Sequence, residues 1–420
     1  MSLYNSEITT REINSVFDRE SFKTEFRLNP DTVYLANIRL CNSGITSSEA
    51  DTYNKLLGAI ACIKSIQLYD NNTLLDQILE GSFLNSFRNV NFVNSDNISM
   101  NRYLKHHGLG YLSEGDQSYV AGVPTRDSQK VLTQNPSDNV GDKAWISLKD
   151  MLPFLKASSS LPTNVFTKLR LVINWKSATE LKDLVTLRRD ATISTIANTF
   201  LIADEVNNGN MKTQMMSGYQ GVQYRPVEHD SVQVNAISGL ADSAGNTTKT
   251  QTNNFMVNGF DNKRVRKLVI VQTPLDSTTW IDGVKNKGYS NQGSVAQYKT
   301  KYQCRVNGSN LIARDGWDGD NQRLAHLVDS WGDCNIIAGQ NNVFLDDIDN
   351  NVEGGTELAG QLDYTGIIVD DHVREMVVDF ERVGVFGNAK QNQALRLNIF
   401  GEVEKAVVVG SNGRYNVVYV

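Results

Sequence analysis

The stretch Lys168–Trp175, K-L-R-L-V-I-N-W, decides the fold class of this chain because its apolar side chains recur at every second position. The apolar set is Leu169, Leu171, Ile173 and Trp175, and the opposite set is Lys168, Arg170 and Asn174. Strict period-two alternation predicts a β-strand with one buried face and one wet or interfacial face.

The same alternation returns near the end of the chain, where Leu395, Leu397 and Ile399 alternate with Arg396 and Asn398. Each alternating stretch is followed by further apolar strand-like runs. After the second, two such runs flank Gly410–Gly413, whose Asn-Gly step is a strong hairpin signal. A pattern that occurs twice predicts two similar β-sandwiches in tandem, with only a few short helices in the loops.

The length of 420 residues suits two domains of about 150–200 residues each. Composition places the boundaries. We expect an N-terminal arm at 1–22, a first sandwich at 23–206, a connector with a projecting loop at 207–260, and a second sandwich at 261–420. The run Val265–Val271 is apolar enough to be a strand buried on both faces. One short helix is expected over Ser147–Leu152, with Leu155 on its apolar face, and Pro153 should limit or kink it.

Charge and hydropathy exclude several classes of protein. The formal net charge is −6. This argues against a protein that binds nucleic acid over its whole surface, because neutralising phosphates requires a basic face. No run of eighteen apolar residues exists, so no membrane-spanning helix is expected, and the N-terminus carries no apolar signal-peptide core. The four cysteines form no close ligand pairs, which predicts reduced, buried thiols.

One acidic loop invites a metal assignment. Its calcium candidates are Asp347, Asp349, Asn351 and Glu353. However, the glycine of an EF-hand loop is missing, and Leu358 occupies the position of the bidentate glutamate. A solvated acidic loop is the preferred interpretation, and we expect no metal.

Histidines and basic residues offer few other candidates. His106, His107, His229 and His326 belong to no recognisable set of nucleophile, base and orienting group. The basic run 263–267 is either a strand start with solvated or intersubunit-paired side chains, the preferred interpretation, or a nucleic-acid contact. No phosphate-binding loop is present, so we expect no catalytic residue, no cofactor and no enzymatic activity.

Several segments resemble the double jelly-roll major capsid proteins, with the polinton-like viruses and virophages as the nearest branch. In the first half the segments are Phe26–Tyr34, Ile38–Gly44, Ile63–Asp70, Ile146–Leu155, Leu161–Trp175 and Phe200–Val206. In the second half the similarity is weaker and rests on Gly259–Asn262 and the closing VVVGSNGRYNVVYV.

This resemblance implies two upright eight-stranded jelly rolls per chain and a homotrimer with six similar walls, a pseudo-hexagonal capsomer that tiles an icosahedral shell. It also implies neighbouring capsomers, penton and minor capsid proteins as partners. An internal membrane or the genome would lie at the inner face, and no small-molecule substrate is expected. The location would be the virion, assembled inside the host cell.

A second class remains open from the residues alone. A lectin-like or attachment β-sandwich would bind carbohydrate or a protein receptor through loops at one end. Among shell proteins, a penton-type subunit is disfavoured because it needs only one jelly roll. From the clean alternation of their strands we expect Arg170 and Arg396 to lie near contacts between subunits or between the two rolls.

Overall fold

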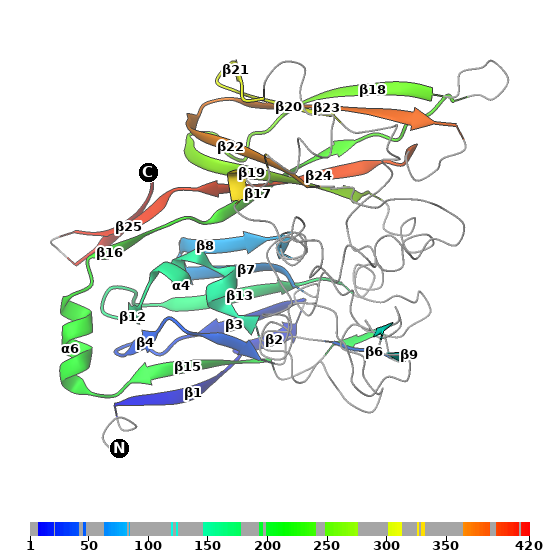
Figure 1. The fold of residues 1–420 in the computed structure, drawn as a ribbon. Helices are drawn as coiled ribbons and strands as arrows, with labels where there is room; N and C mark the ends of the chain where they lie inside the picture. The colour runs from blue at the N-terminus through cyan, green and yellow to red at the C-terminus, as the bar shows by residue number, and fades with distance from the viewer. Residues whose placement is uncertain are drawn as a thin grey trace.

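The computed structural model describes residues 7–20, 22–41, 45–47, 63–81, 84, 119–120, 123–124, 146–177, 193–195, 199–240, 248–275, 301–312, 326, 329–331, 364–386, 392–410 and 413–420. The described parts are mostly antiparallel β-sheet, with short helices between strands (Figure 1). The all-β prediction is confirmed.

The first half contains two main sheets. One follows the order β11-β5-β15-β4-β12, with β1 added on β15, and the other follows β2-β3-β13-β7-β8. The strands of the first sheet are β1 (Ile8–Asn14), β4 (Val33–Leu35), β5 (Arg39–Cys41), β11 (Ile146–Ser147), β12 (Ser160–Pro162) and β15 (Phe200–Val206). Those of the second are β2 (Phe17–Glu20), β3 (Lys23–Arg27), β7 (Ile63–Asp70), β8 (Thr73–Leu79) and β13 (Leu169–Trp175).

Two small antiparallel pairs complete the described strands of the first half. They are β6 (Ile45–Ser47) with β14 (Ile193–Thr195), and β9 (Tyr119–Val120) with β10 (Val123–Pro124).

The second half repeats the arrangement with two four-stranded sheets. One follows β17-β24-β19-β22 and the other β18-β23-β20-β21. The strands of the first are β17 (Val227–Val234), β19 (Lys263–Pro274), β22 (Tyr364–Val373) and β24 (Leu395–Val403). Those of the second are β18 (Thr248–Met256), β20 (Lys301–Val306), β21 (Ser309–Asn310) and β23 (Met376–Val385).

The strand order identifies both halves as jelly rolls. If the strand positions of each half are numbered one to eight along the chain, one sheet has the order 1-8-3-6 and the other 2-7-4-5. In the first half β4 with β5, and β11 with β12, each share one position. The second half has the same order with single strands. Two Greek-key sandwiches of identical topology therefore follow one another in the chain.

This topology corrects two expected boundaries. The expected arm 1–22 contains β1, which occupies position 1 of the first roll and pairs along its whole length with β15, from Ile8 opposite Val206 to Asn14 opposite Phe200. The expected connector 207–260 contains β17 and β18, which occupy positions 1 and 2 of the second roll. The sequences of β1 and β18 are polar and contain too few apolar residues for alternation to predict a strand, whereas β17 overlaps the strand-like pattern at Ser231–Ile237. The two rolls span 8–206 and 227–403.

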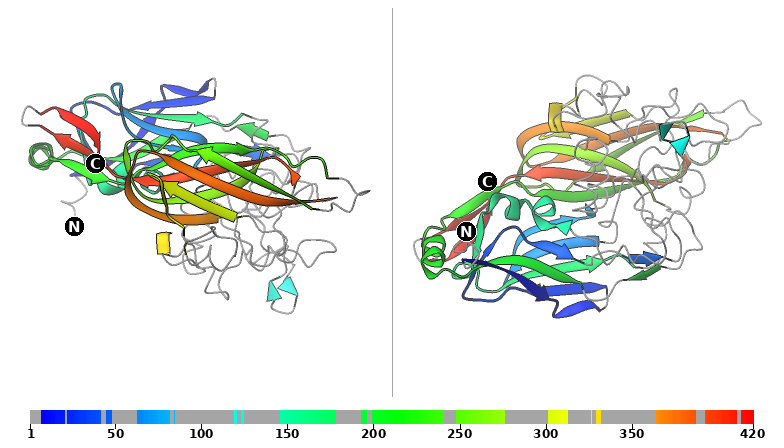
Figure 2. Two further views of the ribbon diagram at one scale, coloured as in Figure 1. Left: turned by 90° about the horizontal axis from the view of Figure 1, so that it is seen from above. Right: turned by 60° about the horizontal axis from the view of Figure 1, so that its bottom comes forward.

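The segment between the rolls is short. Helix α6 (Gly209–Ser217) starts at Asn208, whose side-chain oxygen accepts from the N–H groups of Asn210 and Met211. Strand β16 (Gly221–Tyr224) then forms a three-stranded sheet with β25 (Lys405–Val409) and β26 (Tyr415–Tyr419). The predicted hairpin around Gly410–Gly413 is confirmed by the β25–β26 pairing. The start of β1 and the C-terminal end of the chain lie at the same end of the molecule as α6 (Figures 1 and 2).

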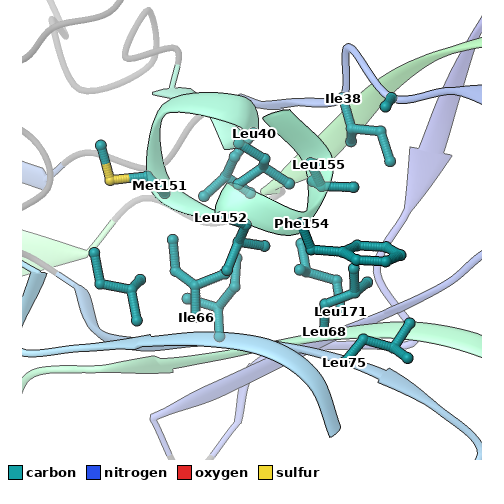
Figure 3. Close-up of a cluster of buried hydrophobic side chains, with 14 of the residues drawn as sticks. Ile38, Leu40, Ile66, Leu68, Leu75, Met151, Leu152, Phe154, Leu155 and Leu171 are labelled. Carbon is teal, nitrogen blue, oxygen red and sulfur yellow. The ribbon is translucent and has the colours of Figure 1, made fainter. Parts of the chain in front are cut away.

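A bent pair of helices closes the core of the first roll. Helices α3 (Leu148–Met151) and α4 (Pro153–Ala157) are separated by Leu152, so the kink predicted at Pro153 is confirmed. The side chains of Leu152 and Phe154 point toward residues of the strands β7, β8 and β13 (Figure 3), and Met151 is buried as well. Full burial of a Leu or Phe side chain contributes about 1.5–3 kcal/mol to the stability of the fold. The two helices are therefore a substantial part of the core of the first roll.

Candidate functional site

The contact between the two rolls is the most extensive functional feature of the chain. The outer face of the sheet β17-β24-β19-β22 contributes Val269, Val271 and Phe400 to the same buried cluster as Phe154 of the first roll. The inner face of that sheet supplies a separate core, which includes Leu268, Ile270 and Ile399 among others. The second roll is therefore apolar on both faces of one sheet. The predicted burial of both strand faces is confirmed for Leu268, Val269, Ile270 and Val271, whereas Arg266 and Lys267 are half-buried.

Polar contacts also join the rolls and the C-terminal hairpin. The hydroxyl of Tyr224 donates to the carbonyl of Leu75. The hydroxyl of Tyr415 donates to Oδ2 of Asp70 over 2.8 Å. Because a buried hydroxyl without a partner costs free energy, these bonds fix how β16 and β26 lie on the first roll. We refer to the whole contact between the rolls as the seam.

Part of the seam is open. A cleft of about 600 Å³ lies between the rolls and is lined from both of them. Its walls are Phe22, Lys64, Ser65, Leu79, Glu80, Asn174, Trp175 and Ser177 of the first roll and His229, Ser231 and Arg396 of the second. Arg396 therefore lies at a roll–roll contact, as expected. Arg170 instead lies over the ring of Tyr69 in its own roll, 4.8 Å from the centroid, so its expected subunit contact stays a prediction.

The histidine and metal candidates have different outcomes. His229 lies in the cleft, and His326 lies in the short helical stretch near Trp331. His106, His107 and the calcium candidates Asp347, Asp349, Asn351 and Glu353 lie outside the described residues. Among the residues that the structure does describe, no three His, Cys, Asp or Glu side chains gather into a metal-binding group.

The basic run 263–267 begins β19, so the expected strand start is confirmed. Its side chains, which were expected to be solvated or paired between subunits, pair instead with carboxylates of the same chain. Arg266 Nε lies 2.7 Å from Glu404 Oε1, and its guanidinium also binds Asp370, which lowers the pKa of that carboxyl group. The full set of pairs is Lys263 with Glu228, Arg264 with Asp370 and Glu404, Arg266 with Asp370 and Glu404, and Lys267 with Glu402. Because these carboxylates neutralise the basic side chains, the run offers little free positive charge for binding the phosphates of a nucleic acid.

The cysteines that the structure describes are buried thiols. Cys41 and Cys304 are free, and burial raises the pKa of each to about 12. Such thiols are poor nucleophiles because the thiolate is scarce. Within the described part of the chain, every helix is too short or too polar to cross a membrane.

The outer faces of the molecule differ in character. On the sheet β18-β23-β20-β21, a polar groove of about 350 Å³ is floored by Asp379, whose Oδ1 accepts from Asn254 at 2.6 Å and from Arg305 at 3.0 Å. On the sheet that contains β15, the outward side chains Phe200 and Ile202 are half-buried. This outer face thus carries apolar area without a described roll packed over it.

Sequence reasoning missed the apolar half of the seam. The signal was present at Ile399-Phe400, where two consecutive apolar residues interrupt the alternation of β24. A strand covered on one face alternates, whereas a strand covered on both faces does not. Tyr224 and Tyr415 gave no comparable signal. A tyrosine occurs both on the surface and in the core with its hydroxyl hydrogen-bonded, so its presence in a sequence does not distinguish the two.

Comparison with known proteins gives the fold. Neither protein-family models nor curated protein sequences match this chain. A chain in the cryo-EM structure of the Sputnik virophage superposes with a TM-score of 0.59 at 10% identity, covering 100% of this chain and 91% of that one. The mavirus major capsid protein gives 0.51 at 10% identity, covering 100% and 91%, and the Faustovirus major capsid protein gives 0.53 at 7%, covering 98% and 93%. This chain thus has the double jelly-roll fold found in viral major capsid proteins.

Proposed function

We propose that this chain is the major capsid protein of an icosahedral virus. The observation that carries the proposal is the pair of jelly rolls with identical strand order, joined by an apolar seam, over a length that capsid proteins of the same fold match almost completely. Such a chain is a building block whose faces bind other faces. Function in this class needs no catalytic group.

The proposed assembly is a homotrimer with a pseudo-hexagonal outline. Three chains with two rolls each supply six similar wedges, and a ring of six wedges tiles a surface nearly as a true hexamer does. The contact between chains is heterologous, meaning that two different surfaces meet, and such contacts generate closed rings when the rotation closes.

Internal repetition suggests which surfaces meet. In the second roll, β24 is the strand at position 8, and its outward side chain Phe400 is covered by the first roll. In the first roll, β15 is the strand at position 8, and its equivalent outward side chain Ile202 is half-buried. We expect the second roll of the neighbouring chain to cover Phe200 and Ile202. The contact between chains would then resemble the contact between the two rolls of one chain.

The assembled shell would supply the remaining partners. Neighbouring capsomers, penton and minor capsid proteins are the expected contacts, and an internal membrane or the genome would lie at the inner face. The corresponding location is the virion, after assembly in the host cell.

A size measurement tests the proposal. We expect the purified protein to have a mass near three times 46.7 kDa in light scattering, and to give hexagonal outlines in negative-stain micrographs. A stable monomer would contradict it.

The alternative function, a lectin-like or attachment sandwich, gains some support from the polar groove near Asp379. It would be favoured over the shell subunit if a monomer bound immobilised glycans saturably and lost that binding on Asp379→Ala substitution.

A further inference from the structure

The C-terminal strand β26 has one edge that no described strand covers. Along its other edge it pairs with β25, and two backbone hydrogen bonds fix which groups face that partner. The N–H of Gly410 donates to the carbonyl of Arg414 at 2.7 Å. The N–H of Val420 donates to the carbonyl of Glu404 at 3.1 Å. Because bonded and unbonded pairs alternate along an antiparallel ladder, every second residue of β26 directs its backbone groups away from β25. These residues are Tyr415, Val417 and Tyr419.

The outward backbone groups have no partner within the described part of the chain. In the described sheets, β25 is the sole neighbour of β26. No described residue accepts from the N–H groups of Tyr415, Val417 and Tyr419. A row of unpaired backbone groups at a sheet edge is a template on which another strand can pair.

The strand also lacks the features that keep sheet edges apart. It is five residues long, contains no charged residue and no proline, and pairs with β25 without a register shift. Every other described edge strand of five residues or more carries a charged side chain, which discourages pairing between edges. These charges are Arg11 and Glu12 on β1, Asp76 on β8, Glu228 and Asp230 on β17, Lys249 on β18, and Asp370 and Asp371 on β22.

The two faces of β26 have different surroundings. Tyr415 and Val417 pack against the core of the first roll, and the hydroxyl of Tyr415 donates to Asp70, so the strand is held in place before any partner arrives. On the opposite face, Val418 and Val420 are 41% and 48% exposed. A fixed strand with an open edge and exposed valines is a preformed docking surface for a further strand.

The absence of charge favours a second copy of the same strand as the occupant. Two identical antiparallel strands around a two-fold axis bring equal charges close together, and like charges on paired strands are destabilising. With Val417 on the axis, Tyr415 lies opposite Tyr419 of the second copy, and Asn416 lies opposite Val418 of the second copy. The nearest charged residue in sequence, Arg414, then lies opposite Val420 of the second copy and meets no like charge.

We propose that β26 pairs antiparallel with β26 of a second copy of this chain, with Val417 on the two-fold axis, so that two three-stranded sheets join into one. The inference rests on the proposed capsid function for its role, which is a contact between neighbouring trimers. This contact is isologous, unlike the heterologous contact within a trimer. Because one pair of short strands buries little area, the contact is weak in dilute solution and forms where many copies are concentrated, as in a shell.

Cysteine cross-linking tests the register directly. Asn416 and Val418 are exposed, and in the proposed register each faces the other across an unbonded pair with a Cα separation of about 4.5 Å, within the range of a disulfide. We expect an equimolar mixture of Asn416→Cys and Val418→Cys proteins to give a disulfide-linked dimer after mild oxidation. Each variant alone should give no more dimer than wild type, because equal positions lie diagonally, about 7–8 Å apart.

A second test removes one outward N–H group. Val417→Pro deletes a donor that points away from β25, and proline is tolerated at such edge positions. Val417→Ala is the matched control, because it also shortens the side chain but keeps the N–H. In sedimentation equilibrium from about 10 µM to 1 mM, the average mass of wild type and Val417→Ala should rise with concentration. Association of Val417→Pro should be at least tenfold weaker.

The outcomes separate this proposal from the capsid proposal. Equal association of the alanine and proline variants would overturn the pairing, and so would a cross-linked mixture that gives no more dimer than each variant alone. The cross-linking result decides the question even if Val417→Pro fails to fold. The mass at the lowest concentration reports the trimer separately, so a trimer without mixture-specific cross-linking would leave the capsid proposal standing.

Discussion

At the residue scale, the buried carboxyl group of Asp76 has a defined structural task in the first roll. Asp76 of β8 is 1% exposed, and burial raises its pKa to about 7. Its Oδ2 accepts from the N–H of Phe154 at 2.7 Å, and its Oδ1 accepts from the N–H of Gln77 at 2.8 Å. Because Pro153 has no N–H, Phe154 carries the first backbone donor of α4, and a side chain from the neighbouring strand satisfies it.

We therefore expect Asp76→Ala to lower the free energy of unfolding by about 1–3 kcal/mol, the cost of leaving a buried donor without an acceptor. Asp76→Asn, which keeps a carbonyl oxygen, should cost less. Chemical denaturation of both variants measures the difference. Equal destabilisation by alanine and asparagine would show that the hydrogen bond to Phe154 is not the source of the effect.

At the element scale, β1 shows how a polar strand can be structural. Thr9, Thr10, Arg11 and Glu12 give it little apolar character, yet it pairs with β15 over seven positions. Ile13 packs against the core of the first roll, and Arg11 Nε lies 2.6 Å from Glu205 Oε2. As the strand at position 1, it also covers the edge of β15, which would otherwise expose unpaired backbone groups.

Deletion of residues 7–14 should thus destabilise the first roll, in contrast to the behaviour of a loose arm. Loss of the Ile13 contact alone is worth about 1–3 kcal/mol, and the lost strand pairing adds to it. Thermal melts followed by circular dichroism measure this. Glu12→Ala, an exposed change on the same strand, serves as the control and should melt like wild type. A deletion variant with an unchanged melting temperature would restore the arm interpretation.

At the scale of the whole molecule, the two rolls share one topology, but in the described part of the chain a roll packs over only one of the two equivalent outer faces. The apolar outer face of β24 is buried in the seam, whereas that of β15 has no described roll against it. Apolar side chains on such a face gain about 25 cal/mol for each Å² that a second chain removes from water. A shell subunit uses this energy for assembly.

Ile202→Asp should therefore weaken the proposed trimer while leaving the fold intact, because Ile202 points away from the core. Light scattering should show a shift from trimer toward monomer at micromolar protein, with an unchanged circular dichroism spectrum. Val408→Asp, an equally simple change at an exposed apolar site on the C-terminal hairpin, is the control. A trimer of unchanged strength in Ile202→Asp would place the interface elsewhere.

Much of the fold was accessible from local pattern. Alternation predicted the strands around Leu171 and Leu397, and the Asn-Gly step predicted the final hairpin. The polar strands β1 and β18 escaped because sequence periodicity reports burial, and these strands are only partly buried. For β17 (Val227–Val234), the pattern at Ser231–Ile237 predicts a strand, but over a range shifted by a few residues toward the C-terminus. The surroundings of His229 escaped for a different reason, since no neighbour in sequence reveals that Asn398 and Phe400 lie beside it.

The sequence by itself determined which segments extend and which of their faces avoid water, because alternation along a strand is a local consequence of one-sided burial. Tertiary structure alone decided that β1 closes the first roll beside β15, that Phe400 is covered by the other roll, and that the basic side chains of β19 meet carboxylates. Those outcomes depend on contacts between residues far apart in the chain, and such contacts are fixed only when the layers pack.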